Sequence, residues 1–345
     1  MRLLEAGGAC LIRAGVGGGE PVSDEANAPV EAGTPVSPPG FKAGFVSIVG
    51  RPSAGKSTLL NRLVGEKVAI TSDKPQTTRN RILGYVNRPN GQIAFIDTPG
   101  LIKPYHAMHA RMMSVAHSAI GEAFVVIWMV DATERDGPHN RSIADLLRQS
   151  GKPVILALNK VDRATKSALL PMMAGLGNRL NFKAVLPISA RTGDGVEMLL
   201  KAVLAELREG PALFPVDEFT DKSERFLVSE LIREAIIHCC GQEVPYATAV
   251  LVRGWEDEQA DGGKIRISAD ITLEREGQKA IVIGKQGAML KKIGTEARTE
   301  IEAFLDAPVY LELFVKVRKG WREDDRAVRE VIEGRYRVTP AHAGA

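Results

Sequence analysis

The chain has 345 residues, a length that suggests two domains and leaves room for a third. Its hydrophobic share of 44% and its charged share of 25% are typical of a globular protein that buries a sizeable core. The formal charge of +3, from 45 basic and 42 acidic residues, excludes a strongly polybasic binding mode but allows local basic patches.

Cysteine content and apolar runs exclude two further classes. Three cysteines, Cys10 and the adjacent Cys239 and Cys240, cannot form a disulfide framework, so we expect a reduced, intracellular protein. The longest apolar run, residues 123–130, has the length of a buried strand and is too short to cross a bilayer. A membrane-spanning protein is therefore excluded, whereas peripheral attachment stays open.

The first 43 residues are rich in Gly and Pro, lack Trp and Tyr, and show no sustained periodicity. Such a segment cannot bury enough apolar surface to offset the entropy of ordering it. We expect a disordered extension, or a start codon placed too early. A targeting peptide is an alternative, although the acidic residues argue against it.

The first motif that carries chemistry follows a short β-branched strand at residues 45–49. Residues 50–57, GRPSAGKS, match the pattern G-x-x-x-x-G-K-[ST] and precede a predicted helix. The glycines allow backbone N–H groups to surround phosphate oxygens, Lys56 can reach the β and γ phosphates, and the Ser57 hydroxyl can bind Mg²⁺. Contacts to the nucleotide are therefore expected from Gly50, Ser53, Ala54, Gly55, Lys56, Ser57 and Thr58.

The choice of base is predicted by residues 159–162, NKVD, which follow a buried strand. Guanine presents two adjacent N–H donors that the Asp162 carboxylate can accept, whereas adenine would leave that carboxylate unpaired. Asn159 can bridge loop segments, and the stem of Lys160 can lie along the base. The residues expected to contact guanine are Asn159, Lys160, Asp162, Ser189 and Ala190, the last two through a backbone N–H to O6.

Two segments between these motifs are expected to contact the γ-phosphate and the metal. Asp97 follows a strand and can hold Mg²⁺ through water, and Gly100 can donate its backbone N–H to the γ-phosphate. Thr78, preferred over Thr77, can ligate Mg²⁺ only when a γ-phosphate is present, so its loop should order with GTP and relax after hydrolysis. The expected metal ligands are Ser57, Thr78 and Asp97, and the expected catalytic residues are Lys56, Thr78 and Gly100.

Leu101 stands where many GTPases have a water-orienting Gln. The sequence therefore predicts slow intrinsic hydrolysis, in which catalysis comes from positioning and from charge neutralisation by Lys56, Mg²⁺ and backbone donors.

These elements, in this order, resemble the translation-factor-related class of small GTPases. Residues 50–52, 74–79 and 97–101, with a linker-like segment at 215–221, resemble the bacterial Era family, and the resemblance covers roughly residues 44–322. It implies an α/β P-loop GTPase domain, with a mostly parallel sheet and helices on both faces, followed by a smaller α+β type II KH domain.

The second half of the chain supports this reading. It contains, in order, a predicted helix, two strands, a GKQG segment at residues 284–287, a second helix and a closing strand. This is the order of elements in a type II KH domain. A GxxG loop clamps about four nucleotides of single-stranded RNA, because its glycines permit close backbone approach. The residues expected to bind RNA are Gly284, Lys285, Gln286, Gly287, Lys291, Lys292, Lys316, Arg318 and Lys319.

We therefore predict a disordered extension (1–43), a GTPase domain (44–210), a linker (211–224), a KH-type RNA-binding domain (225–322) and a C-terminal tail (323–345). We predict a monomeric, GTP-hydrolysing switch joined to an RNA-binding domain. The resemblance implies that it binds 16S ribosomal RNA near its 3′ end and assists 30S subunit maturation. It also implies a cytoplasmic protein with peripheral inner-membrane association. Two alternatives remain: a regulatory GTPase whose C-terminal domain binds protein, and an ATP-dependent RNA remodelling enzyme, which NKVD disfavours.

Two further expectations concern single residues. His106, His109 and His117 are predicted to be solvated or on a helix surface, not a metal site, and Trp128 is predicted to lie in the core. The Era-like pattern normally carries Asn where this chain has Ser53, and in related GTPases that Asn helps to hold K⁺ against the phosphates. A weak dependence on K⁺ is therefore expected.

Overall fold

The computed structural model describes residues 38–102, 104–105, 107–241, 243–257, 263–324 and 326–329. Most of the predicted N-terminal extension and C-terminal tail, together with His106, lie outside the described residues.

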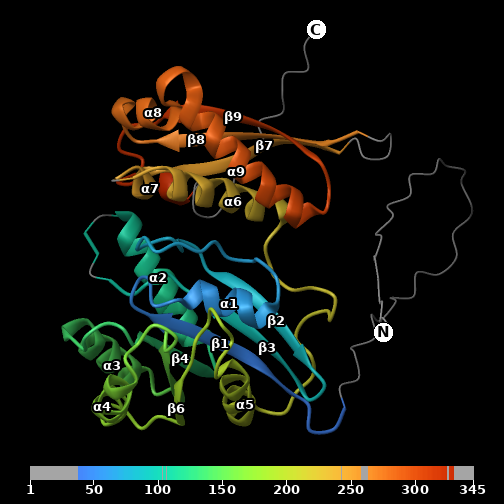
Figure 1. The fold of residues 1–345 in the computed structure, drawn as a ribbon. Coiled ribbons are helices and arrows are strands. Elements are labelled where there is room, and N and C mark those ends of the chain that lie inside the picture. Colours follow the sequence, from blue (N-terminus) through green and yellow to red (C-terminus); the bar gives the residue numbers. More distant parts are fainter. Residues whose placement is uncertain are drawn as a thin grey trace, which may run out of the picture. The chain divides into compact units, whose positions relative to one another are not determined.

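Six strands form the first sheet, in the order β2-β3-β1-β4-β5-β6 (Figure 1). All neighbouring pairs are parallel except β2 and β3. The strands are β1 (Lys42–Gly50), β2 (Ile82–Arg88), β3 (Gly91–Asp97), β4 (Val125–Asp131), β5 (Val154–Asn159) and β6 (Ala184–Pro187). Strands β3, β4 and β5 are buried along their whole length, as expected for a sheet covered on both faces.

Helices cover both faces of this sheet. On one face α1 (Lys56–Val64) and α5 (Val196–Glu206) pack on a core that includes Ile48 and Phe95. On the other face α2 (Ala107–Glu122), α3 (Pro138–Ser150) and α4 (Lys166–Gly177) pack around Trp128, which is fully buried as predicted. The predicted α/β architecture is confirmed, and the loops at the carboxyl ends of β1, β3, β4 and β5 share one edge of the sheet.

A second, smaller sheet follows in the order β7-β8-β9, with β7 antiparallel and β9 parallel to the central strand. Its elements are α6 (Glu224–Cys239), α7 (Val244–Ala247), β7 (Ala249–Asp257), β8 (Ile265–Leu273), α8 (Glu276–Ile283), α9 (Ala288–Leu305) and β9 (Val309–Val317). Apolar residues of α6 and α9 pack on one face of the sheet. The predicted α+β domain is confirmed.

The structure differs from the sequence-based expectation in local detail. Strand β1 begins at Lys42, two residues before the expected start of order, and pairs with β3 from its first residue. The apolar segment expected directly before the GxxG loop is the end of helix α8. None of the helices in the described part of the chain has the length and apolar character needed to cross a bilayer.

Candidate nucleotide-binding site

The phosphate-binding loop connects β1 to α1, and its glycines are required by close approach. A Cβ atom on Gly50 would lie 2.4 Å from the Met129 carbonyl oxygen, and one on Gly55 would lie 2.2 Å from Nδ2 of Asn159. Helix α1 begins at Lys56, so its first backbone N–H groups face the loop. This backbone leaves a cradle for phosphate where the sequence predicts it.

Lys56 is buried and donates to the carbonyl oxygens of Arg51, at 3.0 Å, and Gly50, at 3.4 Å. Burial lowers the pKa of the Lys56 ammonium to about 8, and the charge of Asp97 partly opposes this effect. An anionic phosphate would favour the charged ammonium and would therefore raise this pKa again on binding.

The three predicted metal ligands lie together. The Ser57 hydroxyl donates to Oδ2 of Asp97 at 2.6 Å, and the Thr78 hydroxyl lies 2.8 Å from the Ser57 oxygen and 3.3 Å from Asp97 Oδ2. The other carboxylate oxygen, Oδ1, is buried and has no hydrogen bond within the described residues. Burial raises the pKa of the Asp97 carboxyl, whereas the Lys56 charge lowers it. Hard oxygen ligands and a spare buried carboxylate oxygen fit Mg²⁺.

Gly100 lies against the phosphate-binding loop. A Cβ atom there would meet the backbone nitrogen of Pro52 at 2.6 Å, and the next backbone N–H, that of Leu101, donates to the Gly50 carbonyl oxygen at 3.0 Å. This approach keeps the loop after β3 beside the cavity, next to Lys56.

Asn159 links two of the loops that the sequence predicts to contact the nucleotide. Its Nδ2 donates to the Ala54 carbonyl oxygen at 2.8 Å, and its Oδ1 accepts from the Ala190 backbone N–H at 2.9 Å. Asp162 accepts from the Ser189 hydroxyl at 2.7 Å and pairs with Arg191 at 2.6 Å. These bonds hold the two loops in one arrangement.

The backbone donors expected for guanine O6 have partners inside the protein. The Ser189 N–H donates to the Asp194 carbonyl oxygen at 2.8 Å, and the Ala190 N–H is used by Asn159. Their role toward the base therefore stays a prediction.

Asp131 lies beside the site, although no motif in the sequence indicates a role for it there. The structure pairs its carboxylate with the Lys160 ammonium at 2.6 Å, and this pair lowers the pKa of Asp131 despite its burial. Lys160, whose backbone is left-handed at a φ of 66°, lines the cavity. The signal was present: Asp131 ends β4 at the same sheet edge as Asn159.

A cavity of about 540 Å³ is lined by part of this set, and Asp97, Asn159 and Asp162 are not among its lining residues. The GTPase-domain residues that line it include Lys56, Ser57, Gly100 and Lys160. Its remaining walls come from the loop at residues 70–78 and, unexpectedly, from Ile237 and His238 near the end of α6. The C-terminal domain thus contributes to the wall of the nucleotide cavity.

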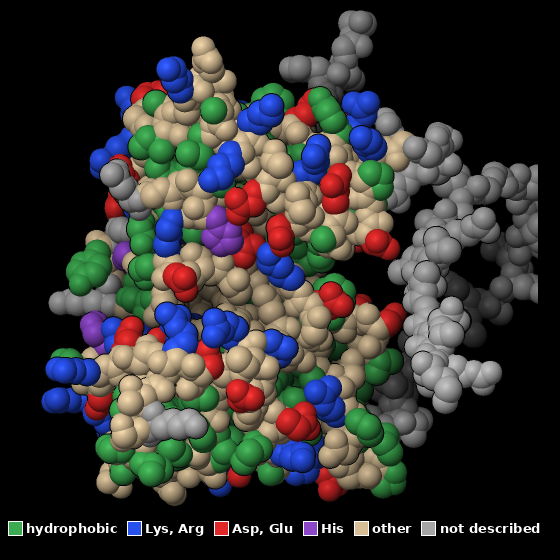
Figure 2. Space-filling view, in the orientation of Figure 1, with side chains coloured by type: hydrophobic (Ala, Val, Ile, Leu, Met, Phe, Trp, Pro, Cys, Tyr) green, Lys and Arg blue, Asp and Glu red, His purple; other side chains and the backbone are tan. Residues whose placement is uncertain are grey.

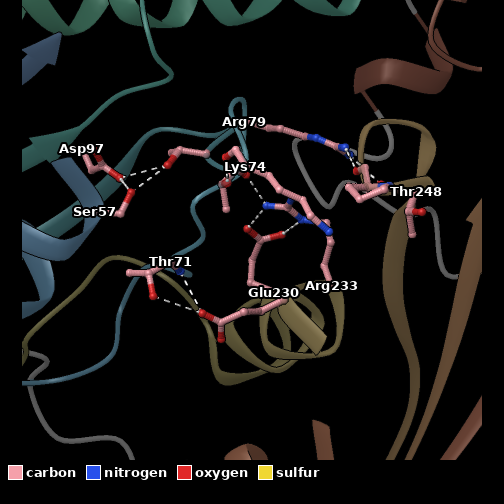
Figure 3. A network of polar contacts seen from close by, with 12 residues as sticks. Ser57, Thr71, Lys74, Arg79, Asp97, Glu230, Arg233 and Thr248 are labelled. Carbon is pink, nitrogen blue, oxygen red and sulfur yellow. Dashed lines mark hydrogen bonds and ion pairs between the residues drawn. The ribbon is translucent and has the colours of Figure 1, made fainter. Parts of the chain in front are cut away.

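The loop around Thr78 is bonded to the C-terminal domain, which the sequence did not predict (Figure 3). Arg79 is buried and donates to the carbonyl oxygens of Thr248, Pro245 and Tyr246 at 2.6, 2.9 and 3.1 Å. Arg233 donates to the Thr77 carbonyl oxygen at 2.6 Å.

Two more contacts of the same kind involve Lys74 and Thr71. Lys74 donates to the carbonyl oxygens of Ile237 and Cys240, and the Thr71 N–H donates to Glu234 at 2.8 Å. Pairing between residues more than 150 positions apart leaves no local sequence signal, so only the structure reveals it.

The prediction that the histidines are solvated or lie on a helix surface is partly wrong. His117 is exposed as predicted, but His109 is buried and lies 2.8 Å from the Gln76 Oε1 atom through its Nε2 atom. His109 is on α2, so this contact joins α2 to the loop around Thr78. No group of three or more His, Cys, Asp or Glu residues in the described ranges could hold a metal ion.

The predicted RNA-binding residues fall into two groups. Lys285, Gln286, Lys291 and Lys292 are exposed around the GxxG turn and the start of α9. Lys316 lies on the opposite face of the sheet, because it alternates along β9 with residues that pack on the helices, and it pairs with Asp270 at 2.8 Å. Arg318 and Lys319 follow it, and Arg318 pairs with Asp324 at 3.2 Å.

The GxxG turn is built by its glycines. A Cβ atom on Gly284 would lie 2.7 Å from the Met289 Cβ atom, and Gly287 has a φ of 78°.

On the face shown in Figure 2, Lys and Arg side chains lie interspersed with Asp and Glu, in keeping with the near-neutral composition.

Comparison with known proteins supports both halves. Residues 45–160 match the family model described as 50S ribosome-binding GTPase, and residues 243–322 match that of the KH domain. GTPase Era of Geobacter metallireducens is 52% identical over 291 residues, which cover 84% of this chain and 97% of the relative. The chain belongs to the Era family of GTPases.

Era proteins from further bacteria and two solved structures agree. GTPase Era of Syntrophus aciditrophicus is 46% identical, over 84% of this chain and 94% of the relative. A crystal structure of Era with MgGDPNP and nucleotides 1506–1542 of 16S ribosomal RNA matches with a TM-score of 0.82 at 40% identity, over 84% of this chain and 98% of that one. An Aquifex aeolicus Era variant bound to GDP and AlF4⁻ matches with a TM-score of 0.81 at 40% identity, over 84% and 99%. The protein is accordingly a GTPase with a C-terminal KH domain.

Proposed function

We propose that this GTPase binds 16S ribosomal RNA near its 3′ end through its KH domain and assists assembly of the 30S subunit. The observation that carries the proposal is the similarity, through both domains, to an Era crystallised with a 16S fragment. The loop around Thr78 is bonded to helix α6. Through these bonds, a nucleotide-dependent change in the loop would be transmitted to the KH domain.

In this function the site residues act as the sequence predicts. The loop at residues 50–58 and Lys56 bind the phosphates, with Ser57, Thr78 and Asp97 holding Mg²⁺, which compensates phosphate charge when bound. Asn159, Lys160 and Asp162 select guanine. We also propose the predicted domain limits, 44–210 for the GTPase domain and 225–322 for the KH domain.

RNA binding is tested with the double variant Gly284→Asp, Gly287→Asp, which adds bulk and negative charge where phosphates would approach. Affinity for a 16S 3′-end fragment is expected to fall to the level of an unrelated RNA, while GTP turnover without RNA stays near wild type. Gly277→Asp is the matched control, because that glycine is exposed at the other end of α8 with no atom near its Cβ position.

An unchanged RNA affinity in the double variant would contradict the proposal. Nuclease-treated co-purification addresses the alternative that the C-terminal domain binds protein, since an RNA-mediated partner is lost and a protein partner stays. A 30S precursor that accumulates on depletion and is rescued by wild type but not by the double variant would establish the assembly role. Peripheral inner-membrane association stays a prediction that vesicle co-sedimentation tests.

A further inference from the structure

Leu101, the residue directly after Gly100, offers no polar side chain to the γ-phosphate. Leu101 is only 8% exposed and packs in the core between the sheet and α2, beside Val49 and Ala116. Its side chain is therefore part of the hydrophobic core, and it cannot supply the carboxamide that many GTPases place at this position.

A carboxamide reaches the cavity from a different segment. Gln76 lies two residues before Thr78 and lines the same cavity as Lys56, Ser57 and Gly100. Its backbone is left-handed, with a φ of 63°, a conformation that non-glycine residues rarely adopt. Such local strain persists where the surrounding structure holds it, and it is common at functional sites.

His109 on α2 fixes the orientation of this carboxamide. Its ring nitrogen Nε2 lies 2.8 Å from the Gln76 Oε1 atom, and the imidazole is only 6% exposed. A carboxamide oxygen only accepts hydrogen bonds, so His109 must be the donor. The oxygen of Gln76 is thereby used, and its NH2 group, which makes no hydrogen bond to the described residues, remains as a donor.

We propose that Gln76 is a catalytic residue that donates a hydrogen bond from its NH2 group to the γ-phosphoryl group of GTP, and that His109 is the positioning residue that orients it. In hydrolysis the oxygen of water bonds to the γ-phosphorus, and the bond from that phosphorus to the β–γ bridging oxygen breaks, releasing GDP. Inorganic phosphate keeps one water proton and the other passes to solvent. The equatorial oxygens of the transferred group carry spread negative charge, which a preorganised donor stabilises.

The test is GTP turnover without RNA in Gln76→Ala and Gln76→Glu, so it does not depend on the proposed ribosomal role. Gln76→Ala is expected to lower kcat about tenfold or more, with KM and GDP affinity within about twofold of wild type. Gln76→Glu keeps the length, loses the donor and adds negative charge, so its kcat should fall at least as far. Affinity for GDP with aluminium fluoride, which mimics the transition state, should fall with kcat.

The positioning role of His109 is tested by variants that remove or keep an N–H donor at this position. His109→Leu should lower kcat without changing GDP affinity, and His109→Gln, which again offers an N–H donor, should recover part of the loss. His117→Ala, an exposed position on the same helix, is the control expected to leave turnover unchanged.

Either of two results would overturn the proposal. In the first, Gln76→Ala keeps kcat within about twofold of wild type. In the second, its GDP affinity falls as much as kcat, which would assign Gln76 a structural role in the loop.

Discussion

At the residue scale, three charged side chains of the nucleotide site, those of Lys56, Lys160 and Asp162, already have polar partners within the protein. Lys160 is held by Asp131, and Asp162 by Ser189 and Arg191. Groups whose rotamers are fixed in this way lose less conformational entropy when a ligand binds. The side chains that the sequence predicts to contact the base are thus already ordered by contacts within the protein.

Replacing Asp162 tests the assignment of the base. In Asp162→Asn the amide cannot accept both guanine N–H groups, so GTP affinity should fall by about 2 kcal/mol or more. Affinity for xanthosine triphosphate should rise, because its 2-oxo group needs a donor. Competition binding with the two nucleotides measures both changes.

The control for this variant is Arg191→Ala, which removes the same ion pair at an exposed side chain but keeps the carboxylate. If Asp162→Asn prefers GTP by the wild-type margin, Asp162 does not read the base.

The buried Lys56 predicts a pH dependence of nucleotide affinity. Its pKa is about 8 in this structure, so above that pH the free protein carries a neutral amine, and binding a phosphate must take up a proton. Affinity for GDP should therefore be flat below about pH 8 and fall up to about tenfold per unit above it.

Calorimetry near pH 8.5 in buffers of different ionisation enthalpy should detect the proton uptake. An affinity that stays constant through this range would show that the Lys56 pKa is not lowered.

At the element scale, the loop around Thr78 is fixed by contacts with its neighbours on every side. Ser57 and Asp97 hold Thr78 from the GTPase domain, and His109 holds Gln76 from α2. The Ser53 hydroxyl donates to the Asp73 carbonyl oxygen at 3.2 Å. A loop held at several points can respond as a unit when one of its partners changes.

Ser53 predicts a weak response to potassium. Its hydroxyl is used by the Asp73 carbonyl, and it lacks the amide oxygen of the family's usual Asn. Exchanging Na⁺ for K⁺ should raise turnover only slightly in the wild type and more strongly in Ser53→Asn. Ser53 has a φ of 59°, and Asn tolerates this left-handed backbone well, so the variant should fold.

Turnover at matched ionic strength in the two salts measures this difference. A large stimulation of the wild type by K⁺ would mean that backbone carbonyls of the loop hold the ion without an Asn side chain.

At the scale of the whole molecule, the two domains share a polar interface around the Thr78 loop. Helix α6 buries two ionisable residues, Arg233 and Glu234, and both bond to the GTPase domain. Buried charges are stable only when they are paired, so these contacts favour the arrangement in which the two domains touch.

Arg79→Ala should weaken this docking. It leaves three carbonyl oxygens without their donor and should lower the free energy of unfolding by about 3 kcal/mol. Thermal unfolding should separate into two transitions. Arg81→Ala, in the same loop but paired with Glu122 instead, is the control and should cost under about 1 kcal/mol. A single transition at the wild-type temperature would contradict this role.

Much of the fold and site follows from local patterns. Asp97 and Asn159 end buried strands, and Lys56 begins the helix that follows the phosphate-binding loop. Motif spacing gives each of these side chains a role that the geometry of the structure allows. Strand limits shifted by a few residues, as at Lys42, because pairing with β3 extends the strand beyond its apolar centre.

The amino-acid sequence by itself determined the two-domain fold, the phosphate-binding loop and the GxxG turn, and it predicts that the Asp162 carboxylate reads guanine, since each depends on residues close together along the chain. Only the tertiary structure decided that Asp131 holds Lys160, that His109 is buried against Gln76, and that Arg79 is anchored in the KH domain. These contacts join residues on separate elements, and the type of a side chain does not indicate which distant residue it will contact. Packing alone brings such pairs together.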